Sequence, residues 1–206
     1  MRCRGCRVTC SDASEKALDI GRELFKRYPP VLNEQSEPTY LPFDRARLEL
    51  EDSTIDRIVV NDAFHHIPNM ETVLSEFYRV LKPSGLVGMS EPGRHHSQSP
   101  ESQYEMKTFN VIENDFVLED VWRVAQTAGF NDIEICPVLR HPMMDMEQYQ
   151  ACIEGEIPAT VTRALVQDTV NHSIFFLHKS KIVAHDHFSP VRDVDSEEQF
   201  DEALYL

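Results

Sequence analysis

Glycine is scarce in this sequence of 206 residues, and so are long apolar runs. Only seven glycines are present, and none of their spacings gives the G-x-G-x-x-G or P-loop pattern that cradles nucleotide phosphates. No apolar run approaches the roughly 18 residues that span a membrane. The arginines near Met1 are not followed by the apolar stretch of a signal peptide. These absences exclude the usual dinucleotide and triphosphate sites, and they predict a cytoplasmic protein without a membrane partner.

Positively charged residues are also few. The chain has 20 Lys and Arg against 35 Asp and Glu, a formal net charge of −15. A domain this acidic repels polyanions, so we expect no nucleic-acid partner. Hydrophobic residues make up 41% of the chain, enough to build a packed core. The odd number of cysteines, five, is typical of a reducing compartment.

Two short patterns are similar to metal-binding motifs. Cys3 and Cys6 form a C-x-x-C pair, but no second pair follows at zinc-ribbon spacing. His185 and His187 form an H-x-H pair without a third ligand nearby. From the sequence we therefore predict no metal site.

Strand and helix patterns alternate along the chain, which favours a layered α/β fold. Apolar and β-branched runs predict strands, and apolar residues at helical spacing predict helices. Residues 94–114 are polar and predict a long loop, and residues 185–206 predict an acidic, largely unpacked tail after a domain over 1–184. Strands are expected at 7–11, 39–43, 57–61, 86–90, 133–139 and 173–178, and helices at 14–28, 73–81, 118–128 and 145–168.

Acidic or amide residues follow three of the predicted strands: Asp12, Asp44, and the pair Asn61-Asp62. In parallel sheets, ligands bind at the carboxyl ends of the strands. One carboxylate there can accept two hydrogen bonds from a ribose diol, and another can accept from an adenine amino group. The alternative is that each side chain caps the turn or helix that follows it.

Residues 5–137 resemble the class I S-adenosylmethionine-dependent methyltransferases, in the group that methylates small molecules. The resemblance rests on several motifs that occur in the family's order. Asp44 lies twelve positions before Asp56, and Gly129-Phe130 follows the 118–128 helix, as in the family. The other motifs are GCRVTCSDAS at 5–14, DRIVVNDAFHHIPN at 56–69 and LSEFYRVLKPSG at 74–85.

The resemblance implies a Rossmann-like methyltransferase sheet, mostly parallel with an antiparallel C-terminal strand, and S-adenosyl-L-methionine as cofactor. It implies that Asp12 binds the ribose, that Asp44 binds the adenine amino group, and that Ala13 and Arg45 belong to the same cofactor-binding site. Asn61 and Asp62 are then expected to line the opening through which the methyl group is transferred.

The family's first strand and its glycine-rich loop are not found before Gly5, so we expect either that the sequence is a fragment or that the protein has lost this element. That strand lies in the middle of the family's sheet, so its loss would leave two unpaired strand edges. We expect the strands that begin near Arg7 and Arg57 to pair directly, or a homodimer or another partner chain to fill the gap.

Histidines and polar residues follow the fourth and fifth strands of the family pattern. His65 or His66 could act as the base that deprotonates a substrate hydroxyl, or both could be structural. Glu91 and the run Arg94-His95-His96 could bind a polar acceptor, or they could belong to a solvated loop.

The sequence thus predicts methyl transfer to a small polar metabolite. A degenerate methyltransferase that works as a non-catalytic binding or scaffold protein is the alternative, and the missing glycine loop favours it. A nicotinamide-dependent oxidoreductase would share the acid after the strand at 7–11, but it would not explain the FHHI and YRVLKPSG stretches.

Overall fold

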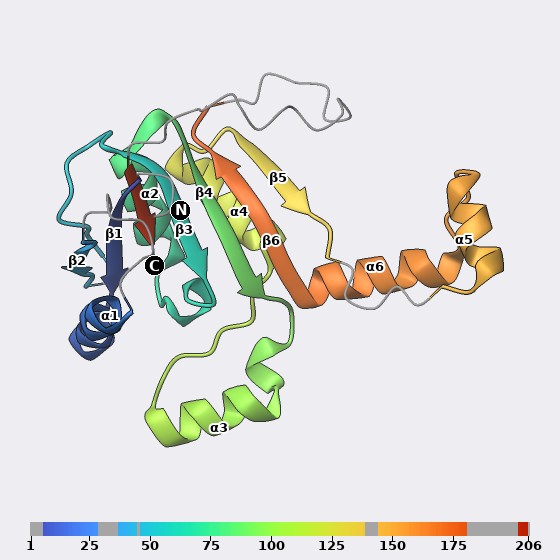
Figure 1. The fold of residues 1–206 in the computed structure, drawn as a ribbon, viewed down its shortest axis with the longest axis horizontal. Coiled ribbons are helices and arrows are strands. Elements are labelled where there is room, and N and C mark those ends of the chain that lie inside the picture. Colours follow the sequence, from blue (N-terminus) through green and yellow to red (C-terminus); the bar gives the residue numbers. More distant parts are fainter. Residues whose placement is uncertain (1–5, 29–36, 45, 139–143, 181–201, 206) are drawn as a thin grey trace.

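The computed structural model describes residues 6–28, 37–44, 46–138, 144–180 and 202–205 (Figure 1). Seven strands form one sheet in the order β2-β1-β7-β3-β4-β6-β5. They are β1 (Arg7–Asp12), β2 (Thr39–Pro42), β3 (Ile55–Asn61), β4 (Leu81–Pro92), β5 (Asp132–Cys136), β6 (His172–His178) and β7 (Glu202–Tyr205). Strand β6 runs antiparallel to both of its neighbours, and the other pairs are parallel. The predicted fold class is therefore confirmed.

Helices flank the sheet and its carboxyl edge. They are α1 (Glu15–Arg27), α2 (Met70–Val80), α3 (Pro100–Phe109), α4 (Leu118–Ala128), α5 (Met146–Ile153) and α6 (Ala159–Asn171). Helices α2 and α4 pack side by side against one face, α3 lies beyond the carboxyl ends of the strands, and α5 and α6 extend away from the sheet (Figure 1). Among the described residues, no helix is long and apolar enough to cross a membrane.

The core lies between the sheet and the α2–α4 layer. Helix α2 presents Val73, Leu74 and Phe77 to the sheet, and all three are fully buried. Burial of each such side chain contributes about 1.5–3 kcal/mol, so packing rather than helix propensity holds α2 in place. On β4, Val87 and Met89 point into the same core.

Arg79, near the end of α2, holds the segment between β2 and β3 against the helix. Its guanidinium donates hydrogen bonds to the carbonyl oxygens of Leu48 and Leu50 and to the carboxylates of Asp52 and Glu76. These bonds raise the pKa of Arg79 and hold the pKa of Glu76 below its usual range. The planar fork of arginine serves all four acceptors at once, as lysine could not.

The middle of the sheet differs from our expectation. Strands β1 and β3 do not pair directly; residues 202–205 of the same chain lie between them as β7, parallel to both. The prediction that 185–206 is an unpacked tail is wrong for these four residues, and residues 185–201 lie outside the described part. Since β7 fills the gap, the gap no longer gives a reason for a partner strand, and a homodimer remains a prediction.

The polar segment 94–114, which we predicted to be a loop, contains helix α3. Ser99 caps it by accepting a hydrogen bond from the Ser102 amide, and Pro100 occupies the first turn, where proline needs no amide partner. The helix ends at Asn110, whose φ of 54° turns the chain back toward the sheet. The residues just after α3 thereby reach the carboxyl edge.

Candidate functional site

A cavity of about 690 Å³ opens at the carboxyl edge of the sheet, between β1, β3 and the end of α3. Apolar and polar side chains share its wall, as is usual for small-molecule sites. The lining residues are Ser11, Asp12, Ala13, Ser14, Phe43, Val60, Ala63, His66, Ile67, Phe109, Asn110, Val111 and Ile112.

Asp12 ends β1 at the wall of this cavity. Its Oδ1 accepts a hydrogen bond of 2.7 Å from the Ser14 amide, and Ser14 in turn caps α1. The Asp12 side chain is exposed, so it combines the capping role with access to a ligand. Ala13 also lines the cavity, and the structure therefore brings both of these predicted cofactor-binding residues to the candidate site.

Asp44 lies next to the cavity wall, but its carboxylate is engaged in a turn. Oδ1 accepts hydrogen bonds of 2.8 Å from the amides of Ala46 and Arg47. These bonds hold the pKa of Asp44 below its usual range. Phe43, the preceding residue, lines the cavity instead. The capping alternative thus describes what Asp44 does in this structure, and Arg45 lies outside the described residues.

Asn61 and Asp62 are exposed at the end of β3 and are not among the residues that line the cavity. The Asn61 side-chain amide donates to Asp62 Oδ2 at 3.3 Å. Asp62 adopts a φ of 48°, and its amide donates to the Ser90 carbonyl. This turn directs the chain into the 3₁₀ turn Phe64–His66. The structure therefore assigns the pair to the turn rather than to the cavity wall.

Glu91 is fully buried, so the predicted contact with an acceptor at the open edge is wrong for this residue. Its Oε1 accepts hydrogen bonds from the amides of Ala63 and Phe64 at 3.1 and 3.0 Å. Its Oε2 accepts from the amide of His65 at 3.3 Å and lies 2.8 Å from His65 Nδ1. Glu91 thus anchors the 3₁₀ turn Phe64–His66 to β4.

The two histidines predicted as catalytic lie in different surroundings. His65 is buried, whereas the side chain of His66 is 39% exposed and lines the cavity. His66 Nδ1 lies 2.6 Å from the Ile112 carbonyl oxygen and 3.3 Å from Glu113 Oε1. Only His66 can therefore touch a ligand in the cavity.

Glu113 and His96 complete this group; from the sequence, His96 was a candidate acceptor-binding residue together with Arg94 and His95, whereas Glu113 was not selected. Glu113 Oε2 lies 2.8 Å from His96 Nε2 and 3.5 Å from His65 Nε2. Glu113 is buried, and its Oε1 makes no hydrogen bond. His65, His66, His96, Glu91 and Glu113 are called the histidine–glutamate cluster below.

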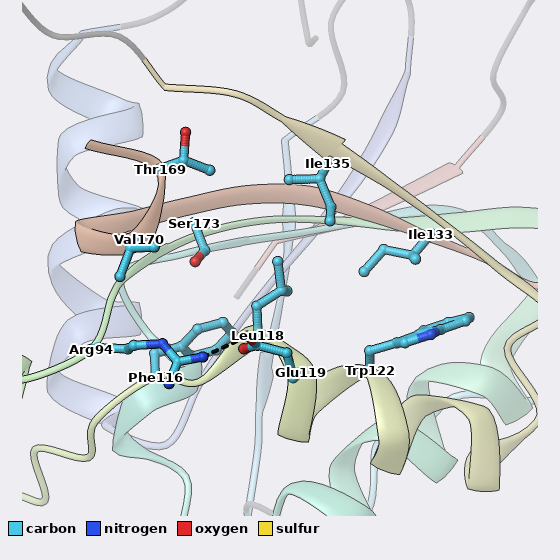
Figure 2. Close-up of a pocket in the computed structure, with 10 residues that line it drawn as sticks. All are labelled: Arg94, Phe116, Leu118, Glu119, Trp122, Ile133, Ile135, Thr169, Val170 and Ser173. Carbon is cyan, nitrogen blue, oxygen red and sulfur yellow. Dashed lines mark hydrogen bonds and ion pairs between the residues drawn. The ribbon is translucent and has the colours of Figure 1, made fainter. Parts of the chain in front are cut away.

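Arg94 and His95 lie apart from this cluster. Arg94 pairs with Glu119 at 2.5 Å across the mouth of a second pocket of about 250 Å³, between α4 and strands β5 and β6. Figure 2 shows this ion pair beside a mostly apolar interior that includes Trp122 and Ile133. His95 is exposed, with a φ of 64°. The structure thus places neither residue at the cavity.

Comparison with known proteins shows a family match over part of the chain and a shared fold over most of it. Residues 1–89 match the family described as "Methyltransferase domain". A solved S-adenosylmethionine-dependent methyltransferase from Mesorhizobium loti aligns with 86% of this chain and 93% of its own, at a TM-score of 0.59 and 13% identity. Phosphoethanolamine N-methyltransferase 2 from Haemonchus contortus, solved with S-adenosyl-L-methionine, aligns with 86% of this chain and 49% of its own, at a TM-score of 0.55 and 20% identity.

The matched residues 1–89 are less than half of the chain, and the solved structures show that its fold is that of S-adenosylmethionine-dependent methyltransferases.

Curated relatives match over a shorter stretch. Sterol 24-C-methyltransferase ERG6 from Saccharomyces cerevisiae is 24% identical over 135 residues, which are 63% of this chain and 34% of that protein. Ubiquinone/menaquinone biosynthesis C-methyltransferase UbiE from an Enterobacter strain is 26% identical over 106 residues, which are 52% of this chain and 41% of that protein. The chain thus spans less than half the length of these relatives.

The chain differs from the methyltransferase pattern at the central strand of the sheet and at the glycine-rich loop. In this sheet, β7 occupies the central position that we assigned from the sequence to the first strand of the methyltransferase pattern. None of the described residues that line the cavity is a glycine, so the described part contains no counterpart of the glycine-rich loop at this site.

Proposed function

We propose that the cavity at the carboxyl edge binds S-adenosyl-L-methionine and that the chain transfers its methyl group to a small polar acceptor. The position of Asp12 carries this proposal. It is an exposed carboxylate at the end of β1, at the edge where parallel sheets bind ligands, and it lies on the wall of a cavity large enough for a nucleoside.

The lining residues fit the nucleoside half of the cofactor. Asp12 offers a carboxylate to the ribose diol, and Phe43 and Val60 offer apolar surface to the adenine ring. When bound, the cofactor supplies an activated sulfonium methyl group. The protein's own part is to hold the acceptor in line with that methyl group, and such positioning supplies much of the acceleration of this kind of reaction.

His66 supports the assignment of an acceptor end to the cavity. It is the one predicted catalytic residue on the wall, together with polar Asn110 from the end of α3. His65, held by Glu91, acts behind it as a positioning residue. Polar groups at this end favour a polar acceptor over an apolar one.

Calorimetric titration with S-adenosylmethionine and S-adenosylhomocysteine tests the proposal. We expect micromolar binding by the unaltered chain and its loss in Asp12→Ala. Asp19→Ala is the matched control, since Asp19 is an exposed acid of α1 that pairs with Arg22. Equal binding by Asp12→Ala would refute the role of Asp12. No binding at millimolar cofactor would favour the non-catalytic alternative, which the absence of a glycine from the described cavity wall supports.

A further inference from the structure

Three ligand atoms of the histidine–glutamate cluster lie close enough together to hold one ion. His65, His66 and Glu113 each offer one atom, and these atoms lie within 4.8 Å of one another. His65 Nε2 is 3.5 Å from Glu113 Oε2, and His66 Nδ1 is 3.3 Å from Glu113 Oε1. An ion bound tetrahedrally at about 2.1 Å separates its ligands by about 3.4 Å. Each histidine has this spacing to one oxygen of Glu113, and because the two oxygens differ, the three ligand atoms must draw together from their present spread of up to 4.8 Å to hold the ion.

One oxygen of Glu113 is buried without a hydrogen-bond donor. The Glu113 side chain is only 1% exposed, and Oε1 has no hydrogen-bond partner. Its other oxygen is taken by His96 Nε2 at 2.8 Å, which fixes the carboxylate. Because an unsatisfied buried acceptor loses its hydration without compensation, this oxygen points to a ligand that binds between Glu113 and His66.

His65 is oriented as a metal ligand would be. Its Nδ1 lies 2.8 Å from the buried carboxylate of Glu91. If that nitrogen donates its proton to Glu91, Nε2 of the neutral ring presents a lone pair toward Glu113. Two acceptors then face each other, and a cation between them removes the repulsion. A carboxylate behind the imidazole is the usual outer partner of a metal-bound histidine.

We propose that His65, His66 and Glu113 bind a divalent transition-metal ion of the zinc class. Two imidazoles and one carboxylate suit zinc and its neighbours better than magnesium or calcium, which prefer oxygen ligands. His66 Nδ1 lies 2.6 Å from the Ile112 carbonyl oxygen, so a proton held there would move to Nε2 of the neutral ring when the ion binds Nδ1. Neither sequence motif that we examined for metal binding includes these residues.

The ion would be reached from the cavity. His66 lines the cavity, whereas His65 and Glu113 lie buried behind it. A three-ligand site of this kind keeps one coordination position open. An acceptor oxygen could occupy that position. Binding of the acceptor to the ion rests on the proposed function, whereas the metal site itself does not. The ion would then replace a free histidine base as the group that orients the acceptor.

Calorimetric titration with Zn²⁺ alone tests the site in a chain that carries His185→Asn and His187→Asn, which removes the H-x-H pair. We expect one ion per chain. His66→Ala, whose half-exposed position should spare the fold, and Glu113→Gln should weaken binding by at least about 100-fold. Glu91→Gln should weaken it by about 10- to 100-fold.

The matched control is His178→Gln, since His178 also pairs with a glutamate, Glu134, at 2.9 Å, but on the β5–β6 side of the sheet. It should bind Zn²⁺ as the parent chain does. Absence of stoichiometric binding, or binding that survives both His66→Ala and Glu113→Gln, would overturn the proposal. The titration contains neither cofactor nor acceptor, so a failure of methyl transfer would not change its result.

Discussion

Glu91→Gln should destabilise the fold far more than its small change in shape suggests. In the native protein the carboxylate accepts four hydrogen bonds, two at each oxygen. Glutamine can keep its oxygen toward the amides of Ala63 and Phe64. Its NH₂ group then faces the amide of His65, where an acceptor stood before, so two donors oppose each other in a fully buried place, and the His65 ring loses a charged partner.

The expected cost follows from these contacts. Loss of the bond between the Glu91 carboxylate and His65 costs about 1.5–3 kcal/mol, and the buried donors left unpaired add about 1–3 kcal/mol. We therefore expect a loss of about 3–5 kcal/mol in the free energy of unfolding. For a domain of this size, that lowers the melting temperature by about 6–20 °C.

Urea denaturation followed by circular dichroism measures the change. Glu119→Gln is the control, because it removes the same charge from an exposed ion pair with Arg94 and should cost no more than about 1 kcal/mol. If Glu91→Gln also costs less than about 1 kcal/mol, Glu91 does not anchor the turn, and the reasoning is wrong.

Two further predictions concern stability. Gly129→Ala should lower the free energy of unfolding by about 1–3 kcal/mol more than Gly155→Ala. Both glycines have a positive φ, but of the two only Gly129 would place a Cβ against the Tyr78 ring, at 2.8 Å. Thermal melts measure the difference, and equal losses would refute this prediction. Arg79→Ala should cost about 2–3 kcal/mol at neutral pH. Since the pKa of Glu76 is lowered mainly by Arg79, the parent chain should lose that contribution as pH falls below the ordinary glutamate range, and urea midpoints measured across pH should show a flatter acid limb for Arg79→Ala.

Much of the fold was predictable because local pattern and tertiary packing agree. Helix α4 has the bounds that its apolar spacing and the following Gly129 predict. Helix α3 was missed because it buries few apolar residues, although Ser99-Pro100 is a recognisable start. Strand β7 was missed because four residues within an acidic segment carry no β-pattern of their own, and its partners β1 and β3 supply the pairing.

A site residue was predictable only where its position at the end of a strand determines that it reaches the cavity. Asp12 reaches the cavity because it ends β1. Glu91 was misplaced, although Val87, Met89 and Glu91 alternate on one face of β4 and so share its buried side. Glu113 gave no local signal, since its role depends on the return of the chain after α3 to the turn at His65.

The central position of β7 has a consequence for how the chain folds. Its backbone pairs residues 202–205 with residues near 8 and near 58, so the sheet closes through contacts that span almost the whole sequence. High contact order slows folding. During synthesis the inner edges of β1 and β3 remain unpaired until β7 emerges from the ribosome, and in that interval they can pair with strands of other chains.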